Sequence, residues 1–118
     1  MQTQQLFAQV EALEPEMVNA LMQLIRVPAV GPENGGEGEQ AKAEVLTKVL
    51  AEVGFDLVER FDAVDSRVPS GVRPNIVATC KGESAQRLWI VTHLDVVPSG
   101  ETSLWKATKP FQPLHQIG

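Results

Sequence analysis

The 118-residue chain lacks several features that would place it in particular classes of protein. Its single cysteine, Cys80, excludes an intramolecular disulfide and is consistent with a reducing cytoplasm. A net charge of −5 without a basic stripe disfavours nucleic acid or an anionic membrane surface as a partner. No apolar run approaches the roughly 18 residues of a membrane span, and the N-terminus does not resemble a signal peptide. We therefore expect a cytoplasmic globular protein of one domain.

Two helices are predicted in the first half of the chain. From about residue 3 to residue 26, apolar side chains recur three and four positions apart, which is one face of a helix. Pro15 should kink this helix or split it into two, and Pro28 should end it. A second helix is predicted over 39–53, with Gly54 at the position where a left-handed cap is needed.

Three strands are predicted to follow, over residues 55–61, 75–81 and 87–92. A long polar connection, 62–74, separates the first two. The connection between the second and third is too short for a helical crossover, so these two strands should run in opposite directions. The expected architecture is α/β, with two helices followed by three strands of a mixed sheet.

The third predicted strand leads into the most informative residues of the chain, WIVTHLDVVP at 89–98. His93 and Asp95 are two positions apart, so on a strand their side chains face the same side, just beyond the strand end. Ligand sites of α/β sheets lie at such ends. Imidazole is a common zinc ligand, and a carboxylate commonly holds its other ring nitrogen. His93 is therefore the candidate metal ligand, and Asp95 is the candidate supporting acid.

A His-x-Asp pair alone is weak evidence for a metal site. A half-buried histidine that is hydrogen-bonded to a nearby aspartate for structural reasons is the commoner case. One histidine also cannot hold a catalytic zinc, which takes about three protein ligands. The only other histidine, His115, lies in the polar tail and is predicted to be a solvated loop residue.

The context of the pair adds a more specific signal. The run THLDVVPSG, followed by Trp105 and then Pro110 and Phe111, resembles the first motif of a large family of zinc-dependent peptidases and amidohydrolases. That family includes acetylornithine deacetylase, succinyl-diaminopimelate desuccinylase, aminoacylase and glutamate carboxypeptidase. The upstream order of two helices, a strand and the stretch RPNIVA is also similar, so the resemblance covers nearly the whole chain.

The resemblance implies a zinc-exopeptidase-like catalytic domain that hydrolyses the amide bond of an N-acyl amino acid or a small peptide. His93 matches the histidine that binds one of two zinc ions. Asp95 matches the aspartate that orients this histidine and is the candidate catalytic residue. Trp105, Pro110 and Phe111 match residues that shape the following loop, and packing is their favoured role. In the family, two zinc ions share a bridging aspartate and activate a water, with a glutamate as general base.

The chain departs from the family pattern after this first motif. The Gly-Arg-Gly segment with the bridging aspartate is expected shortly after Gly118. The paired glutamates, the last histidine ligand and the lid or dimerisation domain are expected further on. We therefore expect residues 1–118 to be the N-terminal part of one catalytic domain, inactive alone, with a homodimer compatible with the full-length enzyme. Two alternatives stay open: a non-catalytic remnant that acts as a binding or assembly piece, and a mononuclear metal-binding module.

Other candidate sites are weaker. The loop at 31–38 has the glycines of a phosphate loop (Gly35, Gly36, Gly38), but no Lys-Ser/Thr follows and acids surround them. Those acids are expected to be a solvated loop and helix start, where negative charge suits the helix dipole (Glu33, Glu37, Glu39). Cys80 is expected to be buried within the second strand. Ser70 and Ser99 lack the G-x-S-x-G elbow of a serine nucleophile.

Overall fold

The structure is a computed structural model, and it describes residues 2–117. The chain divides into two compact units. A terminal unit is made of the residues up to Arg26 together with those from Glu101 onward, and a central unit is made of Val27–Gly100. Among the described residues, no helix combines the length and the apolar character that crossing a lipid bilayer requires.

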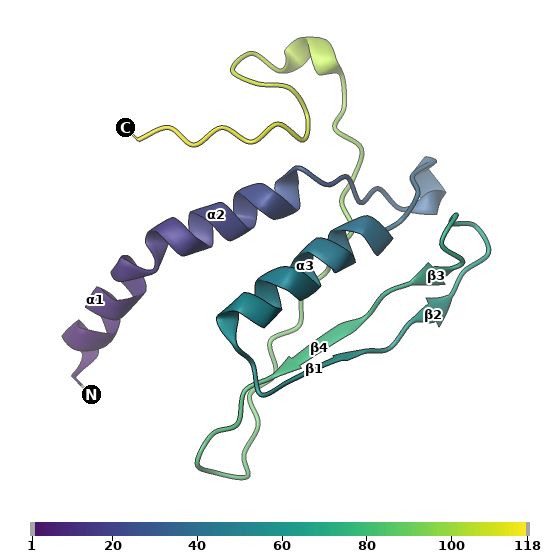
Figure 1. Ribbon diagram of the computed structural model, residues 1–118. Coiled ribbons are helices and arrows are strands. Elements are labelled where there is room, and N and C mark those ends of the chain that lie inside the picture. The colour runs from purple at the N-terminus through teal and green to yellow at the C-terminus, as the bar shows by residue number, and fades with distance from the viewer. Residues whose placement is uncertain (1, 118) are drawn as a thin grey trace. The chain divides into compact units, whose positions relative to one another are not determined.

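The terminal unit begins with two helices, α1 (Thr3–Ala12) and α2 (Glu14–Ile25) (Figure 1). The predicted split at Pro15 is confirmed. Pro15 lies in the first turn of α2, where its missing N–H group has no intrahelical partner to lose. The chain leaves helical structure before Pro28, as the restriction that proline places on its preceding residue requires. The C-terminal part of this unit contains one short 3₁₀ turn, η2 (Thr102–Leu104).

The central unit contains the second predicted helix as α3 (Gln40–Val53). The predicted cap is confirmed: Gly54 has a φ of 83°, and its N–H donates to the Leu50 carbonyl at 3.2 Å. This left-handed conformation is strained for any residue with a Cβ, which is why glycine stands there. The same unit also holds a short 3₁₀ turn, η1 (Pro32–Asn34), in its glycine-rich loop.

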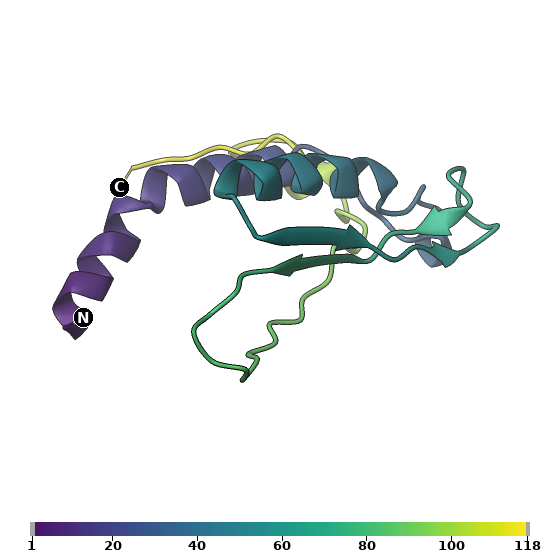
Figure 2. The same ribbon diagram turned by 60° about the horizontal axis from the view of Figure 1, so that its bottom comes forward.

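The first two predicted strands are confirmed in shorter form. They are β1 (Leu57–Arg60) and β4 (Ile76–Thr79), which pair antiparallel with Leu57 opposite Thr79. Helix α3 packs across this two-stranded ribbon (Figure 2). The connection between the two strands is itself structured, because β2 (Ala63–Val64) and β3 (Val72–Arg73) form a second antiparallel pair. Helices combined with small antiparallel sheets are consistent with the predicted α/β class.

Two details of the predicted sheet are wrong. Residues 87–92 form no strand, so the described residues contain two separate two-stranded pairs and not one mixed sheet of three strands. A strand needs a backbone partner and a surface that covers its side chains, and the described residues supply neither to this segment. Cys80, predicted to be buried within a strand, follows the end of β4 and is exposed.

The buried apolar side chains of the described residues are few and small: Ala29, Ala43 and Val68. An ion pair also joins distant parts of the central unit. Arg73 donates from Nε to Glu39 Oε2 at 2.6 Å and from Nη2 to Glu39 Oε1, and Glu39 is only 5% exposed. This bidentate contact joins β3 to the start of α3. It also corrects the expectation that Glu39 is solvated.

A second carboxylate extends the ion pair into a small network. Asp65 Oδ2 accepts from Arg67 Nη2 at 2.7 Å and lies 3.5 Å from Arg73 Nη1. The hydrogen bonds from Arg67, and more weakly the contact from Arg73, hold the pKa of the Asp65 carboxyl well below its usual range. The hydrogen bonds to Glu39 raise the pKa of Arg73 above its already high value. The Asp65 carboxyl and the Arg73 guanidinium are therefore charged at neutral pH.

We expect Arg73→Ala to lower the free energy of unfolding by about 2 kcal/mol, because it leaves a buried Glu39 carboxylate without its charged hydrogen-bond donor. Arg67→Ala is the matched control, since the Arg67 side chain is 61% exposed and its partner Asp65 retains Arg73. Urea unfolding followed by circular dichroism measures both variants. Equal losses of stability in the two variants would contradict the role given to the Glu39–Arg73 pair.

The lowered pKa of Asp65 predicts an acid-sensitive contribution to stability. A carboxyl whose pKa is lower in the folded state stabilises the fold above its unfolded pKa of about 4, and that stability disappears as the pH falls through the folded pKa. We expect the free energy of unfolding to decrease as the pH is lowered below about 4, and Asp65→Asn to make this decrease shallower. Unfolding curves at a series of pH values test the prediction, which fails if the variant keeps the wild-type slope.

Candidate metal-binding site

The segment that carries the candidate site is anchored just after Asp95. Val96 forms a parallel bridge with Val30, and its N–H donates to the carbonyl of the fully buried Ala29 at 3.0 Å. The glycine-rich loop is hydrogen-bonded to the same stretch of backbone, because the Gly38 N–H donates to the Val30 carbonyl at 3.0 Å. A Cβ on Gly36 would lie 2.0 Å from the Val30 oxygen, so only glycine fits there. The glycines of residues 31–38 thus shape a backbone anchor.

The two candidate residues contact each other, although the strand that was predicted to lead into them is absent. His93 Nδ1 lies 2.8 Å from the Asp95 carbonyl oxygen and 3.1 Å from Asp95 Oδ1. Carbonyl and ionised carboxylate oxygens only accept hydrogen bonds, so Nδ1 carries the proton that is shared between them. In the neutral ring, this tautomer leaves the lone pair on Nε2, which is the form that a metal ion requires. The side chains of His93 and Asp95 are 79% and 44% exposed, so the pair lies at the surface of the described residues.

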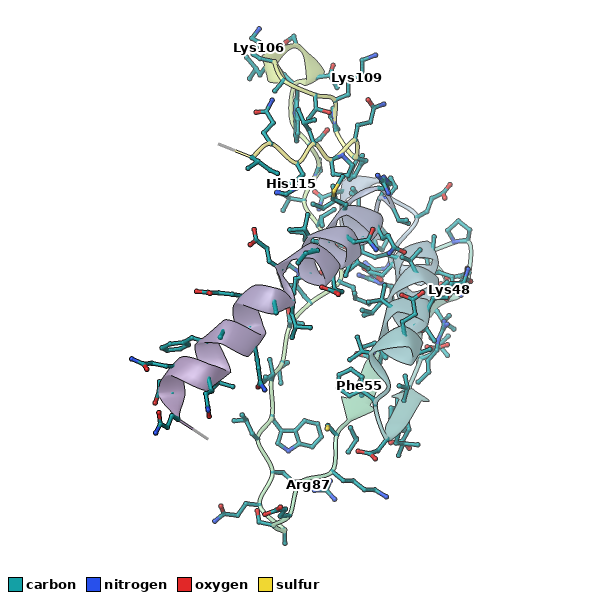
Figure 3. The ribbon with its side chains drawn as sticks, turned by 60° about the vertical axis from the view of Figure 1, so that its left-hand side comes forward. Lys48, Phe55, Arg87, Lys106, Lys109 and His115 are labelled. Atoms are coloured by element: carbon teal, nitrogen blue, oxygen red, sulfur yellow. The ribbon has the colours of Figure 1, made fainter. Side chains whose placement is uncertain are left out.

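This geometry supplies one ligand position and its supporting carboxylate, and the described residues do not supply the rest. No group of three His, Cys, Asp or Glu side chains within 2–117 could hold a metal ion. His115 is exposed in the C-terminal segment (Figure 3). The donor set therefore fits one corner of a zinc site but not a complete catalytic site, which takes about three protein ligands. The assignments of His93 as a metal ligand and Asp95 as its support stay predictions.

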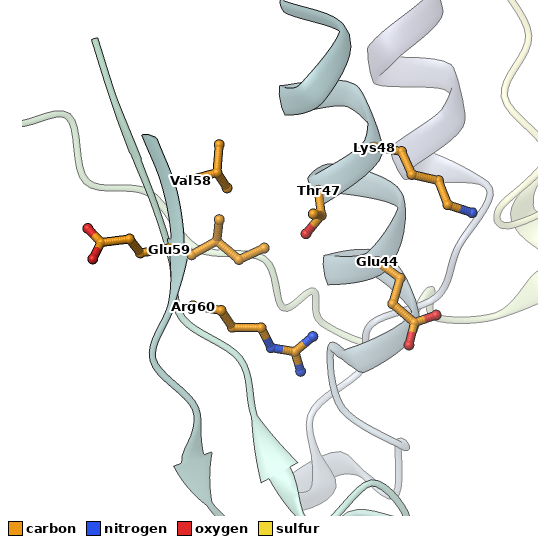
Figure 4. A pocket seen from close by; sticks show the side chains of 7 residues that line it. Glu44, Thr47, Lys48, Val58, Glu59 and Arg60 are labelled. Carbon is orange, nitrogen blue, oxygen red and sulfur yellow. The ribbon is translucent and has the colours of Figure 1, made fainter. Parts of the chain in front are cut away.

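A cavity of about 410 Å³ lies elsewhere in the central unit, between α3 and the β1–β4 ribbon (Figure 4). Val58 and Arg60 of β1 point toward α3, whereas Glu59 points to the opposite side, as alternation along a strand requires. Neither His93 nor Asp95 lines this cavity. Sequence reasoning did not identify the cavity, because it arises from the packing of a helix over two strands.

The weaker candidates have structural explanations. Ser70 Oγ donates to the Val72 carbonyl at 2.9 Å and so stabilises the β2–β3 turn. Glu33 and Glu37 are exposed, as predicted for a solvated loop, whereas Glu39 is buried against Arg73. Phe111 has a φ of 60°, the only non-glycine residue with a positive φ among those described, and its position in a tight turn agrees with a loop-shaping role.

Comparison with known proteins identifies relatives of this chain. It is 36% identical over 107 residues to an uncharacterized metallohydrolase of Methanocaldococcus jannaschii, covering 87% of this chain and 26% of that protein. It is 31% identical over 104 residues to an uncharacterized metallohydrolase of Methanococcus maripaludis, covering 82% and 24%. The chain is homologous to metallohydrolases.

A third relative of this chain is the succinyl-diaminopimelate desuccinylase of Rickettsia felis. The identity is 32% over 101 residues, which is 86% of this chain and 24% of the relative. The predicted resemblance is thereby confirmed, since this desuccinylase is one of the family members that the motif indicated. The chain spans about a quarter of the length of these relatives. No family model and no solved structure matches it.

From the incomplete donor set we expect the 118-residue chain to bind zinc only weakly, with a dissociation constant above about 1 µM. The described residues offer one imidazole, whereas a catalytic zinc site has about three protein ligands. Calorimetric titration of zinc measures this affinity. Histidine NMR signals should show that His93 responds before His115. Sub-micromolar one-to-one binding would indicate a complete mononuclear site.

Proposed function

We propose that this chain is the part of a metal-dependent hydrolase that supplies one metal ligand, His93, together with the residue that holds it, Asp95. The observation that carries the proposal is the contact of His93 Nδ1 with both the carbonyl and the carboxylate of Asp95. The metallohydrolase names of the relatives support it. Asp95 fixes the tautomer and the orientation of the ring, and its negative charge increases the basicity of the imidazole.

The proposed reaction is hydrolysis of the amide bond of an N-acyl amino acid or a small peptide in the cytoplasm. The name of the desuccinylase relative favours an N-acyl substrate. Two zinc ions fit the family resemblance, and when bound they would polarise the amide carbonyl and lower the pKa of a water. The contribution of this chain is to present Nε2 of His93 in the form that a metal binds, next to an anchored backbone at Val96.

The proposal requires groups from outside the described residues. The remaining ligands, the general base and the side chains that select the substrate would come from further residues. The relatives are about four times as long as the part that matches this chain. On its own the 118-residue chain is therefore proposed to be inactive. A homodimer is compatible with the longer enzyme.

In a protein that carries this segment at the length of its relatives, we expect His93→Ala to abolish metal binding and amide hydrolysis. Asp95→Asn should reduce metal affinity or turnover by about 10- to 100-fold, because it weakens the group that orients the ligand. Metal content and hydrolysis of N-acetyl and N-succinyl amino acids measure both effects, with His115→Ala as the histidine control. An Asp95→Asn protein with unchanged metal content and turnover would refute the supporting role.

A non-catalytic assembly piece is the second candidate, and the exposed apolar residues before His93 favour it. The DNA sequence downstream of codon 118 distinguishes the hydrolase from the assembly piece. A reading frame that encodes a Gly-Arg-Gly segment with an aspartate, followed by a pair of glutamates, supports the hydrolase. If no frame there encodes these groups, the assembly role is supported.

A further inference from the structure

The peptide group between Asp95 and Val96 connects the candidate metal ligand to a buried part of the fold. Its carbonyl oxygen lies 2.8 Å from His93 Nδ1 and accepts its proton, a shorter contact than the 3.1 Å to the Asp95 carboxylate. Its N–H donates to the Ala29 carbonyl at 3.0 Å. A trans peptide group is planar, with its C=O and N–H on opposite edges. The hydrogen bond to Ala29 therefore sets the direction in which the carbonyl faces the imidazole ring.

We propose that the backbone at Ala29 and Val30 positions His93, because it fixes the peptide whose carbonyl holds the Nδ1 proton and so keeps the Nε2 lone pair for a metal ion. Ala29 is fully buried, and a buried carbonyl without a donor is costly, which favours its bond to the Val96 N–H. All of these groups lie in the central unit, so the arrangement is complete within this chain. That the lone pair receives a metal rests on the proposed function, whereas the orientation of the ring does not.

The glycine-rich loop holds Val30 in place. The Gly38 N–H donates to the Val30 carbonyl at 3.0 Å. A Cβ on Gly36 would overlap that carbonyl group, and a clash with backbone is not relieved by rotating a side chain. Gly36 is not among the glycines with a positive φ, so its missing side chain serves the close approach and not a turn. Gly36 is therefore a positioning residue that acts on His93 through the backbone at 29–30.

Nuclear magnetic resonance of the wild-type 118-residue chain without metal tests the link from Ala29 to the ring. The Val96 amide should exchange with solvent at least about tenfold more slowly than that of Leu94, after correction for intrinsic rates, because the Leu94 N–H has no backbone partner among the described residues. At about pH 8.5, where histidine side chains are neutral, His93 should show the Nδ1–H tautomer, whereas exposed His115 should populate both tautomers. A Val96 amide that exchanges as fast as Leu94, or a His93 that carries its proton on Nε2, would overturn the proposal.

Gly36→Ala tests the link from the loop to the ring. Because the clash displaces Val30, we expect His93 to populate both tautomers and the Val96 amide to lose its slow exchange. Gly35→Ala is the matched control in the same loop, since no atom lies within 4 Å of its added Cβ, although its φ of 75° makes alanine strained there. The control should lose stability and keep the wild-type tautomer of His93. Circular dichroism establishes that both variants fold. A folded Gly36→Ala chain with the wild-type tautomer, or the same change of tautomer in both variants, would contradict the positioning role.

Zinc titration distinguishes this positioning role from the proposed function. The zinc affinity reported by the His93 signals should fall about tenfold in Gly36→Ala, the lower end of the range for loss of a group that orients a metal ligand, and should stay unchanged in Gly35→Ala. If Gly36→Ala loses the tautomer and keeps its zinc affinity, the positioning of the ring is supported and the ligand role of His93 is refuted. If it keeps the tautomer and loses affinity, the positioning role is refuted and His93 stays the candidate ligand.

Discussion

The Glu39–Arg73 ion pair is the interaction on which the central unit depends. With so few buried apolar side chains, this unit cannot rely on hydrophobic burial alone. The pair joins residues 34 positions apart, β3 and the start of α3, through a bidentate contact. A buried carboxylate is tolerated there because the guanidinium satisfies both of its oxygens.

The ion pair is connected to the candidate site through the neighbouring backbone. Gly38, directly before Glu39, donates its N–H to the Val30 carbonyl, and Val30 bridges to Val96. A Cβ on Gly38 would come within 3.0 Å of Val68, so the loop also packs closely against the β2–β3 turn. The backbone that holds the chain after Asp95 therefore lies next to an ion pair that touches neither candidate residue.

The features that could be predicted from the sequence are those with local causes. The split at Pro15 and the cap at Gly54 depend on backbone restrictions of single residues, and the contact of His93 with Asp95 depends on a spacing of two. Residues 62–74 were predicted to be a polar connection, but they contain the β2–β3 pair, in which Arg73 reaches a glutamate that is distant in the sequence. The burial of Glu39 and the anchoring of Val96 to Ala29 and Val30 also depend on residues that are distant in the sequence, which a linear pattern does not display.

The incorrect prediction of a strand over residues 87–92 has a physical reason that also bears on function. An apolar run with side chains on both faces is the composition of a strand that is covered on both sides, and strand propensity reflects such surroundings more than an intrinsic backbone preference. The structure offers the run neither a paired strand nor a covering layer among the described residues, so the pattern is present without the structure that it specifies. His93 follows this run directly. The candidate metal ligand is therefore held locally by Asp95, and the described residues provide no strand that positions it.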